Sequence, residues 1–164
     1  MRLSFRLKHH FFSAFREFFV HHHGSLNFRA EIFALVIAAD EKANADSYLV
    51  VKEIALEIYN NDTERADLLT LTTKEKVNKV KENNGLDIDV LVTSIQKALK
   101  IVPRYAKKID LDDLQRLLVL TNDEEILSYQ ENILEFLQTL KNETLKDNKI
   151  KIAKDEEKLK EENN

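Results

Sequence analysis

One uninterrupted apolar run, residues 32–39, constrains the fold more than any other feature of this sequence. It ends abruptly on the charged residues 40–42. A helix that is apolar on nearly every face must be surrounded by other helices, whereas the charged residues after it must reach solvent. A weaker copy occurs later, where the apolar residues 117–120 are followed by the acidic residues 123–125. The two copies predict a helical bundle with two weakly repeated halves, each carrying an acidic turn.

The scarcity of turn-forming residues supports an all-α fold. The chain of 164 residues contains two glycines and one proline, and tight β-hairpins depend on glycine. Short polar loops between helices need few such residues. The length suits one domain with a substantial core. We therefore expect an all-α, single-domain bundle of about seven helices.

Composition divides the chain into three parts. Residues 1–24 form a basic, aromatic, amphipathic helix that we expect to end at Gly24, since glycine is a common residue after a helix. Residues 25–140 form the bundle. Residues 141–164 are charged and almost without large apolar side chains, which predicts a tail that is frayed helix or disordered.

Polar residues mark where the helices of the bundle begin and end. Breaks are expected at residues 60–62 and 83–85, and at Pro103. Two capping-box patterns, Thr72-x-x-Glu75 and either Thr121-x-x-Glu124 or Ser128-x-x-Glu131, predict further helix starts. The remaining expected N-caps are Asn27, Asp87, and Asp110 or Asp112.

The two acidic turns are the candidate metal site. A hard divalent cation bound between them would take its ligands from Asp40, Glu41, Asp123 and Glu124. Calcium prefers about six to eight oxygen ligands, so four carboxylates are a small set. The alternative is that these side chains cap helices and face solvent. Apart from this cation, no cofactor is expected.

Residues 31–42, followed by a polar stretch and a new apolar helix, resemble the TerB-like domain. That domain occurs in tellurite-resistance TerB proteins and in DjlA-type co-chaperones. The resemblance implies an all-helical bundle of two pseudo-repeated units, whose acidic turns have been regarded as a metal-binding patch. It covers roughly residues 28–140.

The match to the family pattern is partial. Asp40 and Asp123 correspond to the two turn aspartates, and glutamate follows each of them where the family usually has glycine. The family glutamate seven residues after each aspartate is replaced here by Ser47 and by Gln130.

The N-terminal helix is the candidate membrane or partner surface. A wide phenylalanine-rich face beside basic residues is typical of a helix lying in a membrane interface. Packing within the bundle, in the groove of a partner protein or in a dimer seam would explain the same pattern. The candidate surface residues are Arg2, Arg6, Phe12, Arg16 and Phe19.

The sequence argues against catalysis and against nucleic-acid binding. It has no cysteine, no glycine-rich phosphate loop and no histidine pair at zinc-ligand spacing. Beyond the first helix the chain is acidic and would repel phosphates. We expect a non-enzymatic TerB-like interaction module that is cytoplasmic or peripheral on the inner membrane. By resemblance, it would serve envelope stress, tellurite resistance or co-chaperone adaptation.

The expected partners are a protein, an anionic membrane surface or a second copy of the chain. The alternative function is a divalent-metal-binding or metal-sensing protein that uses the acidic turns.

Overall fold

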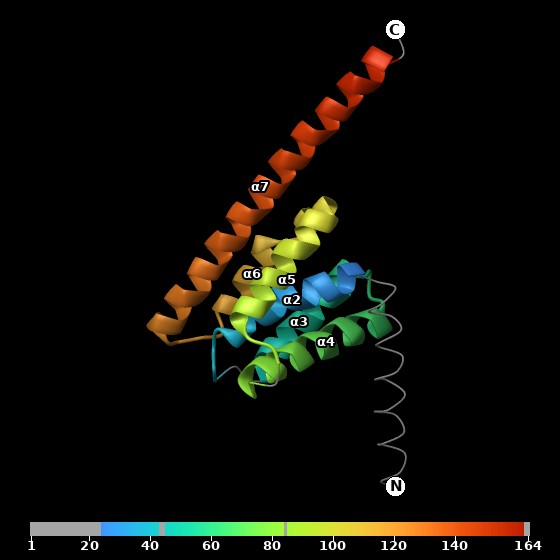
Figure 1. Cartoon of the computed structure of the whole chain (residues 1–164). Helices are drawn as coiled ribbons and strands as arrows, with labels where there is room; N and C mark the ends of the chain where they lie inside the picture. The colour runs from blue at the N-terminus through green and yellow to red at the C-terminus, as the bar shows by residue number, and fades with distance from the viewer. Residues whose placement is uncertain (1–23, 43–44, 84, 163–164) are drawn as a thin grey trace.

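The described part of the chain is an all-α bundle, as predicted. The computed structural model describes residues 24–42, 45–83 and 85–162. Those residues contain six α-helices and one 3₁₀ helix (Figure 1). The elements are α2 (Gly24–Ala38), α3 (Ala45–Ile58), α4 (Thr63–Lys81), α5 (Ile88–Ile101), η1 (Pro103–Lys108), α6 (Leu111–Leu118) and α7 (Glu124–Glu162).

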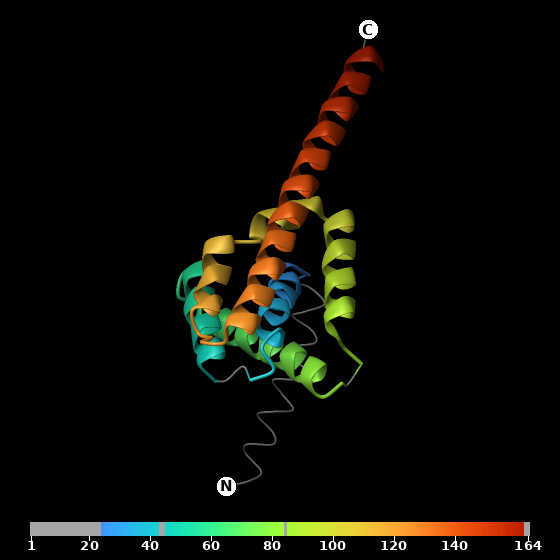
Figure 2. The same ribbon diagram turned by 90° about the vertical axis from the view of Figure 1, so that its left-hand side faces the viewer.

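Helix α2 lies at the centre of the bundle. Residues 30–38 are all buried, and α2 contacts α4, α5, α6, α7 and η1. The two views of the ribbon show the other helices arranged around it (Figures 1 and 2). The prediction of a buried helix followed by a charged turn is confirmed. Helix α2 takes the central position because its apolar side chains, on nearly every face, all gain free energy by leaving water.

The expected start of this helix was wrong. Gly24, the first described residue, is helical and belongs to α2 (Gly24–Ala38), so it is not the residue that follows the end of a helix. Asn27 lies inside α2, where its Nδ2 donates to Glu31 Oε1 at 3.2 Å. A Cβ on Gly24 would lie 2.8 Å from the hydroxyl of Tyr105, so glycine allows η1 to approach α2 closely here.

Two of the predicted boundaries are confirmed in detail. Asn60 and Asn61 have φ of 53° and 64°, and this left-handed backbone ends α3. Asp62 Oδ1 then accepts from Arg65 N at 3.1 Å and caps α4. Asp87 Oδ1 accepts from Val90 N at 2.7 Å and caps α5.

The break expected within residues 63–83 does not occur. Helix α4 is continuous through Thr72, whose Oγ1 donates to Leu68 O at 2.7 Å. Thr73 Oγ1 donates in the same way to Leu69 O at 2.8 Å. A threonine hydroxyl that returns its hydrogen bond to the preceding turn can remain inside a helix, so the capping-box pattern was misleading.

A 3₁₀ helix that the sequence did not predict joins α5 to α6. Pro103 ends α5 as expected and also opens η1. Of the two predicted starts for α6, the structure has Asp110, whose Oδ1 accepts from the backbone N–H groups of Asp112 and Asp113 at 3.0 and 3.2 Å. Lys141 Nζ donates to Ile109 O at 2.7 Å and holds this connection against α7.

Helix α7 is 39 residues long and extends far beyond the bundle (Figures 1 and 2). Both capping-box starts were wrong, because Asp123 Oδ1 accepts from Glu125 N and Ile126 N at 3.1 and 3.2 Å. The charged segment from Lys141 continues the same helix without a break. Residues 149–162, a length of about 20 Å, are exposed on every side. We call residues 149–162 the α7 arm.

Length alone does not make α7 a membrane span. No helix in the described ranges is both long enough and apolar enough to cross a bilayer.

Candidate functional site

The structure brings the two acidic turns together. The turn after α2 and the start of α7 line one open groove of about 490 Å³, to which Glu41, Asp123 and Glu125 contribute. Lys42 and Tyr129 line it as well. Two of the four predicted metal ligands, Glu41 and Asp123, therefore border the same space. Glu124 is exposed at the first position of α7 and does not line this groove.

Asp40 faces a different space. It lines a cavity of about 20 Å³ with Ser47, Thr121 and Gln130. Its Oδ1 accepts from Lys42 N at 2.8 Å, which closes the turn. Asp40 and Asp123 thus both accept hydrogen bonds from backbone N–H groups close to them in sequence.

The groove has carboxylates but no ready-made metal site. Among the described residues, no group of three or more His, Cys, Asp or Glu side chains is arranged to hold a metal ion. Lys42 places a cation in the groove that would compete with a metal for the carboxylates. The aspartates close a turn and cap a helix as they stand. To bind a cation, the carboxylates that line the groove would have to move closer together.

Gln130 has a structural role that a glutamate could not perform. It is 3% exposed, and its Nε2 donates to Val36 O at 3.0 Å, which ties α7 to α2. Its Oε1 is buried with no hydrogen-bond partner among the described residues. An ionised carboxylate only accepts hydrogen bonds, so it could not satisfy the Val36 carbonyl. The presence of glutamine at position 130 therefore has a local physical reason.

A buried charge network joins α2, α4 and α5. Glu31 is 6% exposed, and its Oε1 accepts from Ser94 Oγ at 2.8 Å and from Asn27 Nδ2 at 3.2 Å. Lys76 Nζ lies 3.5 Å from the same oxygen. Burying a carboxylate is costly unless a cation and hydrogen-bond donors surround it, and here three helices supply them. This network was not predicted from the sequence. The available signal was a glutamate at the start of an apolar run.

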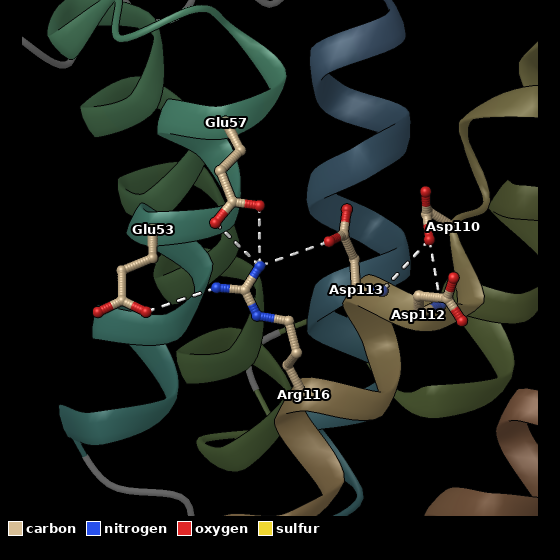
Figure 3. A network of polar contacts seen from close by, with 6 residues as sticks. All are labelled: Glu53, Glu57, Asp110, Asp112, Asp113 and Arg116. Atoms are coloured by element: carbon tan, nitrogen blue, oxygen red, sulfur yellow. Dashed lines mark hydrogen bonds and ion pairs between the residues drawn. The ribbon is translucent and has the colours of Figure 1, made fainter.

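A second polar network links α3 to α6 at the surface (Figure 3). Arg116 Nη1 lies 3.2 and 3.0 Å from the two carboxylate oxygens of Glu57, and Nη2 lies 3.5 Å from Glu53 Oε2. Asp113 Oδ1 is 3.6 Å from Nη1. Both glutamates are largely exposed, so each pair contributes less than about 1 kcal/mol.

The protonation of Asp113 reflects its crowded position in this second network. Burial raises the pKa of its carboxyl above the usual 3.8, and the neighbouring charge of Asp110 raises it further. Arg116 acts in the opposite direction. Asp113 is thus an acidic group that the fold accommodates at some cost, next to a cation that moderates that cost.

The predicted membrane or partner surface cannot be placed on this fold. Arg2, Arg6, Phe12, Arg16 and Phe19 all lie outside the described residues.

Comparison with known proteins adds no relatives. Scans of protein-family models, of curated proteins and of solved structures found no protein that this chain matches. The TerB-like domain therefore remains a prediction that rests on residues 31–42 and on the second acidic turn.

Proposed function

We propose that this protein is a non-enzymatic interaction module that contacts a partner through the α7 arm. One observation carries the proposal: the arm projects from the bundle as helix, with no part of it buried. Its large apolar residues face solvent, with Ile150 45%, Ile152 49% and Leu159 58% exposed. Apolar side chains along a solvated helix gain free energy once a second helix covers them.

The spacing of those residues favours a helical partner. Leu145, Ile152 and Leu159 follow one another at intervals of seven, so they lie along one face of α7. Leu145 packs against the bundle core, so the face begins at the bundle and continues outward. A helix of another protein or the α7 arm of a second copy would fit alongside it.

The biological setting follows from resemblance alone. The TerB-like pattern supports a role in envelope stress, tellurite resistance or co-chaperone adaptation. It is also the basis for a location in the cytoplasm or at the inner face of the membrane. Attachment to a membrane through the N-terminal helix remains an expectation about residues 1–23.

Site-specific photo-crosslinking in cells tests the proposal. A crosslinker placed at Glu156 on the α7 arm should give a discrete product, and one placed at Lys97 on α5 should not. The double variant Ile152→Gln/Leu159→Gln should remove the product, because it removes the apolar face without adding charge. The control variant Lys151→Gln/Lys158→Gln should retain it. The proposal fails if Glu156 gives no discrete product, or if the product survives loss of the apolar face.

A second candidate function is divalent-metal binding. It is favoured by the shared groove, which places Glu41, Asp123 and Glu125 along one space. Calorimetric titration with calcium, magnesium and zinc should then show binding that weakens at least about tenfold in Asp123→Asn. Binding no tighter than millimolar for all three ions would eliminate this candidate.

A further inference from the structure

Four cationic side chains gather where α2 meets η1. We call them the α2–η1 basic cluster, which consists of Arg29, Arg104, Lys107 and Lys108. Arg29, Lys107 and Lys108 line one cavity of about 70 Å³, whose apolar wall comes from α2, α3 and α6. Burial lowers the pKa of the Lys108 ammonium, and the charges of Arg29 and Arg104 lower it further. Like charges from segments far apart in sequence are therefore held close together.

Nearby carboxylates do not neutralise this cluster. Within the part of the chain that the structure describes, none of its four members forms an ion pair with an acidic side chain. Arg29 instead lies over the ring of Tyr59, with its Cζ 5.7 Å from the ring centroid. The four cations outnumber the two carboxylates that line the same cavity, so the cluster has an excess of positive charge that attracts anions, even on a chain whose net charge is −4.

Two aspartates line the same cavity, and each has another role. Asp110 accepts the hydrogen bonds that cap α6, and Asp113 pairs with Arg116 at 3.6 Å. Their charges limit how deeply an anion can enter. Lys107 lines the cavity and Arg104 lies on the same 3₁₀ helix. Both side chains are exposed, so both are accessible to an anion at the surface.

We propose that the α2–η1 basic cluster is a binding site for a phosphate-bearing anion. An arginine presents a planar set of donors that matches phosphate oxygens, and lysines add mobile point charges. The phosphate could belong to the headgroup of an anionic phospholipid or to a soluble molecule. Both sources present the same chemistry to the site.

Gly24 and the basic sequence before it favour a lipid headgroup as the source of the phosphate. Gly24, the first residue that the structure describes, lies against Tyr105 of η1, the 3₁₀ helix that carries Arg104, Lys107 and Lys108. Residues 1–23 contain four Arg or Lys side chains and one Glu. The basic residues predicted to face a membrane thus lie in the part of the sequence that precedes α2, the helix that carries Arg29. This inference concerns η1 and α2, and it is independent of the α7 arm.

The experiment compares three forms of the full chain. The test variant Arg104→Gln/Lys107→Gln removes two exposed cations from the cluster. The control variant Lys79→Gln/Lys97→Gln makes the same charge change on α4 and α5, at residues that are also exposed. Far-UV circular dichroism verifies folding of all three. The first arm measures binding to vesicles of phosphatidylcholine mixed with phosphatidylglycerol, and to phosphatidylcholine alone. The second arm titrates inorganic phosphate while amide resonances of residues 103–108 are monitored by NMR.

The two arms distinguish a lipid headgroup, a soluble phosphate and the absence of a site. For a lipid headgroup, the test variant should bind the anionic vesicles at least about tenfold more weakly, whereas the control stays within about twofold of the wild type. For a soluble ligand, inorganic phosphate should shift the resonances of residues 103–108 saturably in the wild type and control but not in the test variant. The site is disproved if the test and control variants behave alike in both arms. Crosslinking from the α7 arm would be unaffected by that result, so the two proposals can fail separately.

Discussion

Helix α2 and the α7 arm are both regular helices, yet they are stabilised by different interactions. Residues 30–38 of α2 are all buried, and residues 149–162 of α7 are all exposed. Buried α2 is rich in β-branched and aromatic side chains, which are only moderate helix formers. The arm is rich in lysine and glutamate, which are good helix formers. Tertiary packing therefore holds α2 in place, whereas local preference holds the arm.

The energetic scale of the two regions differs accordingly. Burying one large apolar side chain stabilises a fold by about 1.5–3 kcal/mol, whereas one charge pair on an exposed helix contributes about 0.2–0.5 kcal/mol. A bundle stabilised by buried apolar side chains unfolds as a unit. An exposed helix stabilised by local preference and charge pairs can fray without unfolding the bundle. Substitutions in the arm should therefore leave the stability of the core nearly unchanged.

The largest expected effect is in α2. Leu35 is fully buried, so Leu35→Ala should reduce the free energy of unfolding by about 2–5 kcal/mol through lost burial and the cavity that remains. Chemical denaturation measures this. The matched substitution Leu159→Ala on the arm should change it by less than about 0.5 kcal/mol. Equal losses of stability at the two positions would contradict the claim that packing of α2, and not the arm, stabilises the bundle.

The buried charge network should come next. Glu31→Ala removes the acceptor shared by Ser94, Asn27 and Lys76, and we expect a loss of about 2 kcal/mol. A double-mutant cycle with Lys76→Met isolates the ion pair, whose coupling should be about 0.5–3 kcal/mol. A coupling of zero would mean that the network contributes nothing beyond the packing of its side chains.

A smaller, pH-dependent effect is expected at Asp113. Because its folded-state pKa is raised, the folded protein holds this proton more tightly than the unfolded chain does. The contribution of Asp113 to stability is therefore most favourable below its unfolded pKa, and it is lost as pH rises through the folded pKa. Asp113→Asn should be within about 0.5 kcal/mol of wild type at neutral pH. Relative to wild type it should become less stable as pH falls toward 3. A difference that does not vary with pH would contradict this assignment.

The smallest effect on the bundle should come from breaking the arm itself. Lys154→Pro disrupts the helix locally, at a cost of about 3 kcal/mol to the arm. Hydrogen exchange should show faster exchange for residues beyond 150, while the denaturation midpoint of the bundle stays unchanged. A shift of that midpoint would show that the arm stabilises the core.

Much of the fold could be predicted from the sequence because its determinants act over short distances. Asp62, Asp87 and Asp110 cap helices by accepting hydrogen bonds from residues two or three positions away. The unbroken apolar run placed α2 at the centre. The capping-box predictions failed in two ways. Thr72 and Ser128 lie inside α4 and α7, and the Thr72 hydroxyl donates back to Leu68 O. Thr121 lies in the loop before α7, where its Oγ1 accepts from Asp123 N, and Asp123 caps the helix instead.

The candidate sites depended on tertiary structure. The sequence identified acidic turns after α2 and before α7, but only packing determined that Glu41 and Asp123 share a groove and that Asp40 lies apart. Likewise, Arg29 is far in sequence from η1, and no local pattern indicates that they meet.

The sequence by itself thus determined the all-α class, the buried centre and the starts of α4, α5 and α6, since periodicity and capping are encoded within a few residues of each other. Tertiary structure alone decided which charges meet, because the distance between side chains on different helices is set by how those helices pack. For the same reason, the Glu31 network and the basic cluster can be identified only from the tertiary structure.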